Sequence, residues 1–339
     1  MILVPDSVCP GDQELLTQAA HLSEYPNIQD CSRSSIQEFS QHSGIELATA
    51  LLYDRITRQP SNGDFMRRVQ ADTAAPGHFP LIGIVPGAFY RNHTNTGADG
   101  AAVVRILEGL GCRVECVPVE SFGSLAANAN IIRRWLEQRR GQSIALMSLS
   151  KGTADVKVAL GMPDAMELFR NVAIWVSISG LPQGTPLVAW LNRQPLRRLG
   201  VKLVLWWRRQ SYSVIEELSD SPGSTLKSWP ALPQSLKIIH IVGFPLRRHL
   251  THPWAPRGYE RVRALGPNDG GGFLLADSAG LPGIVLPIWG ADHYLQPAWD
   301  VAALFRRVLS AALSLAVEEA QASLSASKPS SAPASKSSA

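Results

Sequence analysis

Short apolar runs alternate with amphipathic stretches from about residue 78 onward. The apolar runs, which are typical of strands buried on both faces of a sheet, lie at 81–85, 112–119, 143–147, 171–179, 235–243 and 283–289. Helical patterns lie between and after them, at 96–111, 124–140, 151–160 and about 299–319. Strands that alternate with helices in this way predict an α/β fold with a doubly wound, mostly parallel sheet.

The first 75 residues differ from the rest, because their pattern is helical throughout. Ser43 and Glu46 have the spacing of a capping box, and apolar residues then repeat at helical intervals. The turn-forming run at 60–63 is expected to end that helix. We therefore predict an N-terminal helical extension over 1–75, which either packs on the core or forms part of a lid.

Residues 181–232 interrupt the alternation of strands and helices. A connection of this length inside a compact domain should have structure of its own, so we predict a mostly helical cap. The segment is rich in tryptophan, and includes Trp190, Trp206 and Trp207. Each of these could simply pack inside the cap, but as a group they suit a pocket for an apolar acyl or aromatic group.

The core of the fold is then expected over 76–180 and 233–322. The remaining segment, 323–339, consists entirely of serine, alanine, lysine, proline and leucine. Such a composition cannot bury enough apolar surface to offset the entropy cost of ordering. We expect this tail to be disordered.

Charge and cysteine content narrow the class of protein. The net charge of +4 is modest and the basic residues are scattered, which argues against nucleic-acid binding. The four cysteines, Cys9, Cys31, Cys112 and Cys116, form no CxxC pair, so we expect free thiols in a reducing compartment. The N-terminus lacks the pattern of a secretory signal, and no apolar run reaches the length of about 18 residues that a membrane span needs. We expect a cytoplasmic protein with no transmembrane segment, and nothing in the pattern indicates its oligomeric state.

A tight turn, Ser148-Leu149-Ser150-Lys151-Gly152, connects the third apolar run to the helix that follows it. A strand, a small-x-Ser-x-Gly turn and a helix together form a nucleophile elbow, in which the positions two before and two after the central serine must be small. The turn would project the Ser150 hydroxyl at a helix N-terminus, which makes Ser150 the candidate nucleophile. The alternative is an ordinary turn in which Ser150 caps the helix.

A serine nucleophile needs a base, and a carboxylate that orients the base. His293 follows the last apolar run through a short loop and is the candidate base. Asp269, in the glycine-rich loop 266–272, is the candidate acid, so the three residues occur in the order Ser, Asp, His. Asp277 is the next alternative for the acid, whereas Asp292 would normally point away from its neighbour His293.

The candidate oxyanion donors are backbone amides. One is the amide of Lys151, directly after the nucleophile, and the side chain of this lysine is expected to point to solvent. The other is the amide of Ala88 or Phe89, where Gly87 would allow a close approach. Tyr90 follows directly and is a further candidate for lining the pocket.

The chain offers little to hold a metal. His249 and His252 lie close together after the fifth apolar run. No carboxylate or cysteine beside them completes a ligand set. We therefore expect neither a metal nor a cofactor.

Four short segments of the chain resemble the α/β-hydrolase superfamily, and in particular its lipase and esterase branch. The resemblance covers about residues 78–320 and rests on PGAFY at 86–90, SLSKG at 148–152, PNDGG at 267–271 and GADH at 290–293. The acid loop is similar to that of bacterial triacylglycerol lipases, in which its aspartate is the triad acid, and this implies the same role for Asp269. Lipases of this kind usually have glycine at the position of Ser148, and the first 75 residues resemble no family that we can name.

The resemblance implies a serine hydrolase that cleaves a carboxylic ester through a Ser-His-Asp triad and an acyl-enzyme intermediate. The expected partner is a small-molecule ester with an apolar acyl or aromatic part. The same machinery could instead cleave a thioester or transfer the acyl group to another acceptor. A further alternative is a non-catalytic binding protein that retains the fold.

Overall fold

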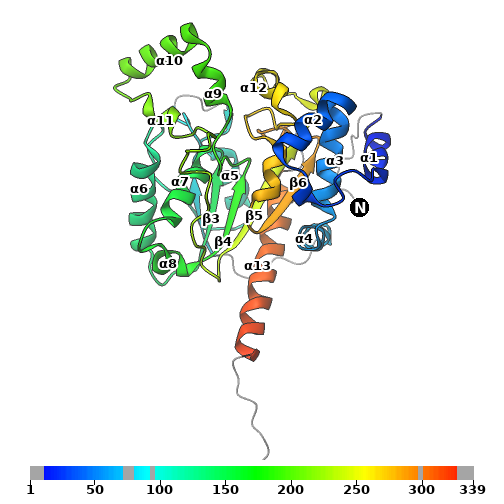
Figure 1. The fold of residues 1–339 in the computed structure, drawn as a ribbon. Coiled ribbons are helices and arrows are strands. Elements are labelled where there is room, and N and C mark those ends of the chain that lie inside the picture. The colour runs from blue at the N-terminus through cyan, green and yellow to red at the C-terminus, as the bar shows by residue number, and fades with distance from the viewer. Residues whose placement is uncertain (1–10, 72–79, 92–95, 297–300, 327–339) are drawn as a thin grey trace, which may run out of the picture.

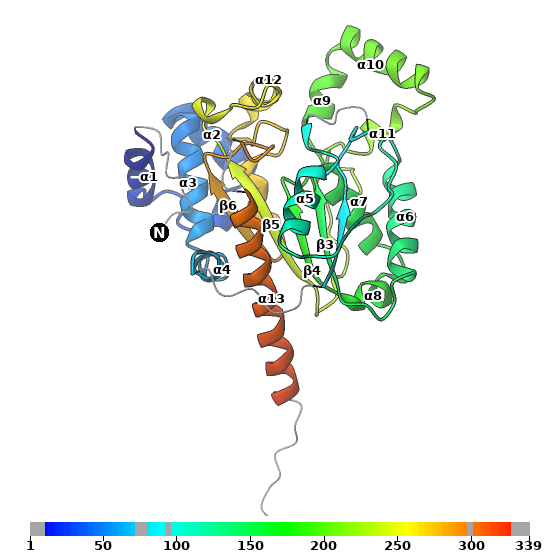
Figure 2. The same ribbon diagram turned by 180° about the vertical axis from the view of Figure 1, so that it is seen from behind.

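A six-stranded, entirely parallel sheet forms the centre of the molecule (Figures 1 and 2). The structure is a computed structural model and describes residues 11–71, 80–91, 96–296 and 301–326. The strands are β1 (Leu81–Val85), β2 (Val114–Cys116), β3 (Ile144–Leu149), β4 (Val172–Ile178), β5 (Lys237–Phe244) and β6 (Ile284–Trp289). Their order across the sheet is β2-β1-β3-β4-β5-β6. The predicted doubly wound α/β fold is therefore confirmed, with a strand at each of the predicted places.

Burial on both faces explains why the strands are continuous apolar runs. Every residue of β1 and β3 is buried, because helices cover both sides of the sheet. In β3, Ser148 lies opposite Val85 of β1 on one side and Ser177 of β4 on the other. Since all strands run in the same direction, the loops after them open at one edge of the sheet, which is where ligands bind in folds of this class.

The helices form one layer on each face. One layer consists of α4 (Pro60–Gln70), α5 (Ala101–Gly109) and α13 (Val301–Ala326). The other layer consists of α6 (Leu125–Glu137), α7 (Lys151–Leu160) and α8 (Ala165–Leu168). Alternate residues of β3 point into the two layers, with Met147 on the α13 side and Leu146 on the α6 side.

The N-terminal extension is helical, as predicted, and packs beside β6 (Figure 1). Before α4 it contains α1 (Asp12–His21), a 3₁₀ turn (Ile28–Asp30), α2 (Arg33–Ser43) and α3 (Ile45–Thr57). Tyr53 of α3 lies edge-on to Phe244 and Trp289 at the ends of β5 and β6, with ring centroids 5.8 and 5.3 Å away. Of the two alternatives, the structure therefore shows packing on the core.

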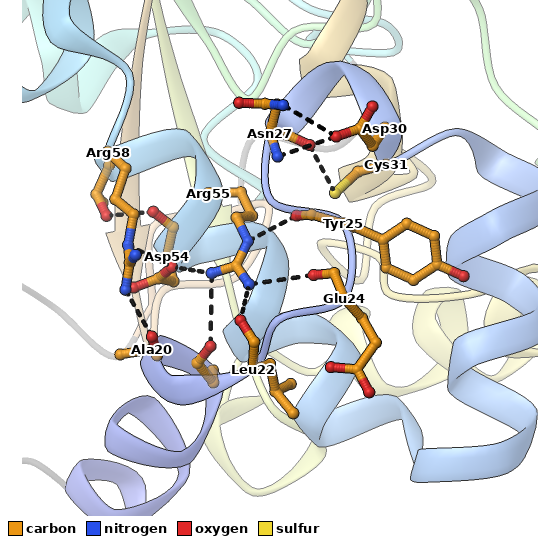
Figure 3. A network of polar contacts seen from close by, with 12 residues as sticks. Ala20, Leu22, Glu24, Tyr25, Asn27, Asp30, Cys31, Asp54, Arg55 and Arg58 are labelled. Atoms are coloured by element: carbon orange, nitrogen blue, oxygen red, sulfur yellow. Dashed lines mark hydrogen bonds and ion pairs between the residues drawn. The ribbon is translucent and has the colours of Figure 1, made fainter.

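A buried arginine ties α1 to α3 (Figure 3). Arg55 donates hydrogen bonds to the carbonyl oxygens of Leu22 and Tyr25, each at 2.7 Å, and also pairs with Asp54. Leu22 directly follows the C-terminal end of α1, where a positive charge is favourable. These contacts hold the segment that follows α1 against α3.

Two details of the prediction for this extension are wrong. Helix α2 runs as far as Ser43, and Gly44 at φ 90° separates it from α3, so Ser43 does not cap the following helix. Pro60 does not end a helix, because α3 has already ended at Thr57. Instead Pro60 begins α4, at a first-turn position where its missing N–H costs nothing.

The insertion at 181–232 contains the helices α9 (Leu187–Asn192), α10 (Pro195–Trp207) and α11 (Ser213–Glu216). Helix α10 stands out at the end of the molecule toward which the strands point, and α12 (Ala255–Val262) lies at the same end (Figures 1 and 2). None of the described helices is long and apolar enough to cross a membrane. Helix α13 extends to Ala326, and the rest of the tail predicted over 323–339 lies outside the described residues.

Candidate active site

Ser150 lies between the end of β3 and the start of α7 with a backbone conformation that non-glycine residues seldom adopt. Its φ and ψ are 47° and −115°, so the chain turns sharply at this residue. A Cβ on Gly152 would lie 2.5 Å from the carbonyl oxygen of Pro86 and 2.6 Å from that of Val85. Only glycine fits there, because α7 starts directly against the end of β1. The elbow therefore has the geometry that its sequence predicts.

Ser150, His293 and Asp269 form one continuous line of hydrogen bonds. Nε2 of His293 is 3.1 Å from Oγ of Ser150, and Nδ1 of His293 is 2.6 Å from Oδ2 of Asp269. Because a carboxylate oxygen accepts, Nδ1 is protonated and donates a hydrogen bond to Asp269. Nε2 is then free to accept the hydrogen bond of the Ser150 hydroxyl. Three residues from separate loops thus meet as the sequence predicted.

The loop 266–272 holds Asp269 in place. Oδ1 of Asp269 accepts the amides of Gly271, at 2.8 Å, and Phe273, at 3.0 Å, and the carboxylate is fully buried. The carbonyl oxygen of Asp269 also accepts the amide of His293, at 2.7 Å. Backbone contacts therefore fix both the carboxylate and the start of the histidine loop, and the second carboxylate oxygen is left for the imidazole.

The groups around His293 shift the pKa of its imidazole. Burial lowers the pKa of His293, but the negative charge and the hydrogen bond of Asp269, together with the charge of Asp292, raise it by more. The pKa of His293 therefore lies above its usual value. Its imidazole is a stronger base than one that is only buried, which suits a group that must take a proton from a hydroxyl.

The two alternative acids have other partners. Asp277 accepts two hydrogen bonds from Arg33 of the N-terminal extension, at 2.5 and 2.6 Å. Oδ1 of Asp292 accepts the amides of Tyr294 and Gln296, and this shapes the loop after His293. Burial is the main reason that the pKa of Asp292 is raised. The structure brings Asp269, and neither alternative, to the imidazole.

The candidate oxyanion loop follows β1. The amide of Phe89 donates to the carbonyl oxygen of Ser121 at 3.1 Å, so this candidate donor is already occupied. Within the described part of the chain, the amides of Ala88 and Lys151 have no acceptor of this kind. A Cβ on Gly87 would lie 3.4 Å from the Cβ of Ser150, which places this loop directly against the elbow. Ala88 and Lys151 therefore remain the candidate donors.

The side chain of Lys151 does not point to solvent, which corrects the sequence-based expectation. It is 2% exposed, and its Nζ lies 2.7 Å from Oδ1 of Asp155, one helical turn further along α7. Asn128 donates to the other oxygen of Asp155 at 3.1 Å. Burial raises the pKa of Asp155 to about 6 despite the opposing effect of Lys151. The spacing of four between Lys151 and Asp155 was the signal in the sequence that could have indicated this pair.

A buried network of hydroxyl groups lies beneath the elbow and was not predicted. The indole N–H of Trp175 donates to Oγ of Ser148 at 2.9 Å. Oγ of Ser148 is also 2.8 Å from Oγ1 of Thr153, which is 3.0 Å from Oγ of Ser177. These contacts join β3, β4 and α7 directly below Ser150. They show how the side chain of Ser148 is accommodated inside the elbow.

Two of the four pocket candidates lie at the surface of the insertion. Trp206 and Trp207 are 76% and 79% exposed on α10. Trp190 is half-buried and lies under the guanidinium of Arg261, 4.5 Å from its ring centre.

Tyr90 is half-buried, and its hydroxyl donates to the carbonyl oxygen of Val119 at 2.6 Å, so it supports the loop after β1. The sequence analysis did not identify a pair of aromatic residues beside the candidate oxyanion loop. Phe89 and Phe122, with ring centroids 4.8 Å apart, are both half-buried, and Phe89 directly follows the candidate donor Ala88.

The two histidines after β5 do not form a pair. Nδ1 of His249 accepts the amide of Leu246, and its Nε2 lies 3.0 Å from Oδ2 of Asp12. His252 stacks on Tyr294 with ring centroids 3.7 Å apart. No cluster of three or more potential metal ligands occurs among the residues that the structure describes.

Comparison with known proteins gives matches only at the level of structure. No family model and no curated protein matches the chain. A metagenomic carboxyl esterase is similar over 73% of this chain and 78% of its own, at 20% identity and a TM-score of 0.45. The mature form of a Bacillus licheniformis lipase is similar over 74% and 94%, at 14% identity and a TM-score of 0.46. A carboxylesterase from Lactobacillus plantarum is similar over 74% and 89%, at 13% identity and a TM-score of 0.37.

Proposed function

We propose that this protein, which has the α/β-hydrolase fold, is a serine hydrolase that cleaves carboxylic esters through an acyl-enzyme intermediate. The observation that carries the proposal is the hydrogen-bonded line from Ser150 through His293 to Asp269. Its three members have the mutual geometry of nucleophile, general base and orienting acid. The line ends at a hydroxyl on a sharp turn, at the edge of the sheet where this fold places its reactive groups.

In the first half of the reaction, Oγ of Ser150 attacks the carbonyl carbon of the ester while Nε2 of His293 takes the hydroxyl proton. The charge of Asp269 stabilises the imidazolium that forms. When the carbon–oxygen bond of the ester breaks, His293 returns the proton to the departing alcohol, and the acyl group stays on Ser150. A water molecule then attacks the acyl carbon while His293 takes its proton. His293 returns this proton to Oγ of Ser150 as the bond between that oxygen and the acyl carbon breaks, and the carboxylic acid is released.

The negative charge that develops on the carbonyl oxygen needs donors beside Ser150. The amide of Lys151 is at the N-terminus of α7, where the helix dipole favours a negative charge. The amide of Ala88 is the second candidate, because the preceding residue, Gly87, lies against Ser150. Removal of one such donor typically lowers kcat by about 10²–10³-fold.

The aromatic residues next to this loop favour an ester with an apolar acyl or aromatic part. Phe89 directly follows Ala88 and packs on Phe122. Both rings are half-buried and therefore still present apolar surface. An apolar group that contacts them would lose water-exposed surface on binding, which is favourable.

The test combines covalent labelling with hydrolysis of p-nitrophenyl esters of graded chain length. A fluorophosphonate should label the wild-type protein at Ser150, and S150A should show neither labelling nor hydrolysis. S310A is the matched control, because Ser310 is also a buried serine but belongs to α13. Hydrolysis that persists in S150A would overturn the assignment of the nucleophile. A folded wild-type protein that is neither labelled nor active would support a binding function instead.

A further inference from the structure

Helix α10 exposes an unusual amount of apolar surface. The exposed fractions are 84% for Leu196, 54% for Leu199, 56% for Leu203, 76% for Trp206 and 79% for Trp207. Monomeric proteins seldom leave several large apolar side chains together on one element unless that element binds something. Exposure of Trp206 and Trp207 is unfavourable in free energy, because each places a large apolar indole in contact with water.

These five side chains lie on one side of the helix, and Val204, which is 51% exposed, lies about 60° further around the helix axis. At about 100° per residue, the five fall within an arc of roughly 100° around the helix axis. Leu205 lies roughly opposite this arc and is the only buried residue of α10. The apolar stripe therefore points away from the protein, and α10 projects from the end of the molecule (Figures 1 and 2).

Positive charge borders the stripe. Between residues 187 and 210 the chain has no acidic residue and six basic ones: Arg193, Arg197, Arg198, Lys202, Arg208 and Arg209. At helical spacing, Arg197 and Arg208 flank one side of the stripe and Lys202 flanks the other. The long stems of these residues can lie along apolar surface while their charges stay in a polar layer.

We propose that α10 docks on the surface of an anionic phospholipid bilayer, with the five apolar side chains in the interface and the basic residues at the lipid phosphates. An apolar stripe of leucine and tryptophan between basic residues is the pattern of helices that lie in the plane of a membrane surface. The helix is about 20 Å long, too short for the roughly 30 Å of a bilayer core, so it lies on the membrane.

Charge favours this occupant over a second copy of the chain. Two α10 helices packed face to face would bring their basic residues together, and nearby like charges repel each other. An anionic lipid surface instead attracts every one of them.

The end of α10 is also connected to the candidate active site through two contacts. Arg208 lies over the ring of Phe122, 5.6 Å from its centre, and Phe122 packs on Phe89 beside the candidate oxyanion donor. Docking would therefore bring the edge of the candidate active site close to the lipid surface.

The test is sedimentation of the full chain with vesicles, and it requires no turnover. The S150A background keeps the lipid intact whatever the activity of the protein. Binding should be strong to phosphatidylcholine vesicles that contain phosphatidylglycerol and weak to phosphatidylcholine alone. It should fall at 1 M salt, where the screening length is only about 3 Å. The change W206S/W207S should lower the partition coefficient by about tenfold or more.

M166S is the matched control, because Met166 is 53% exposed but belongs to α8 at the other end of the molecule. It should bind vesicles as the parent does. The proposal is overturned if anionic vesicles are not bound, if both vesicle types bind equally, or if W206S/W207S binds like its parent. A dimer that W206S/W207S dissociates, without any vesicle binding, would assign the stripe to a second copy instead.

Discussion

Gly271 lies flat against the imidazole of His293. A Cβ built on this glycine would be 2.0 Å from Cγ of the ring and 2.4 Å from its Nδ1, far inside normal contact distance. The backbone of Gly271 does not have a positive φ, unlike its neighbours Gly270 and Gly272. The glycine is therefore required by space and not by conformation. It lets the acid loop approach the imidazole closely enough for Asp269 to reach Nδ1.

We predict that G271A displaces the imidazole without straining the backbone. A shift of about 1 Å in a reacting group can cost about 10²-fold in rate, and we expect kcat/KM for a soluble ester to fall by at least that factor. The measurement is steady-state hydrolysis, with thermal unfolding to show that the variant is folded. G109A is the control, because a Cβ there meets nothing within 4 Å. Equal activity of G271A and the wild type would mean that the imidazole position is not critical.

The choice of acid gives a second prediction. D269A should lower kcat by about 10⁴-fold, because the imidazole loses both its orientation and the charge that stabilises its protonated form. D277A should leave kcat within about threefold, since Asp277 pairs with Arg33 and does not contact His293. The comparison uses kcat on one ester for both variants. A large loss in D277A with little change in D269A would reverse the assignment.

The strands and the positions of the candidate site residues could be predicted because each has a strong local signal. Burial on both faces produces continuous apolar runs, and a serine elbow permits only small residues at fixed positions. His293 and Asp269 were found from their places in loops after strands, which the topology of the sheet then brings together at one edge. The general plan of the site follows from local pattern and topology.

The direction of individual side chains could not be predicted in the same way. The sequence places Lys151 after the nucleophile, but only the packing of α6 against α7 encloses it with Asp155 and Asn128. Tryptophan content suggested an interior for the insertion, yet Trp206 and Trp207 face outward, because α10 is buried only at Leu205. A pattern of residue types gives the faces of a helix, whereas the rest of the fold decides which face is covered.

The pKa of His293 gives a third prediction. His293 must be neutral to take a proton, so kcat/KM should rise with pH and level off above its pKa. Asp269 and Asp292 raise this pKa by more than burial lowers it, so the midpoint should lie above the usual value of about 6.5. D292N removes one of the charges and should move the midpoint down. The measurement is the pH profile of kcat/KM, and a midpoint below the usual value, or an upward shift in D292N, would contradict it.

Burial of Asp155 makes the stability of the protein depend on pH, and Lys151 opposes this effect. The pKa of Asp155 is raised to about 6, so the folded protein binds a proton that the unfolded chain has lost, and this contribution to stability falls as pH rises from about 4 through 6. K151M removes the opposing charge and should raise that pKa further. The free energy of unfolding of K151M should therefore keep falling above pH 6, by at most about 1.4 kcal/mol per pH unit. Urea unfolding at several pH values measures this free energy.

R133M is the control, because Arg133 and Glu137 have the same spacing but are partly exposed. If the free energy of unfolding of K151M depended on pH no more steeply than that of R133M, Lys151 would not be what stabilises the ionised form of Asp155.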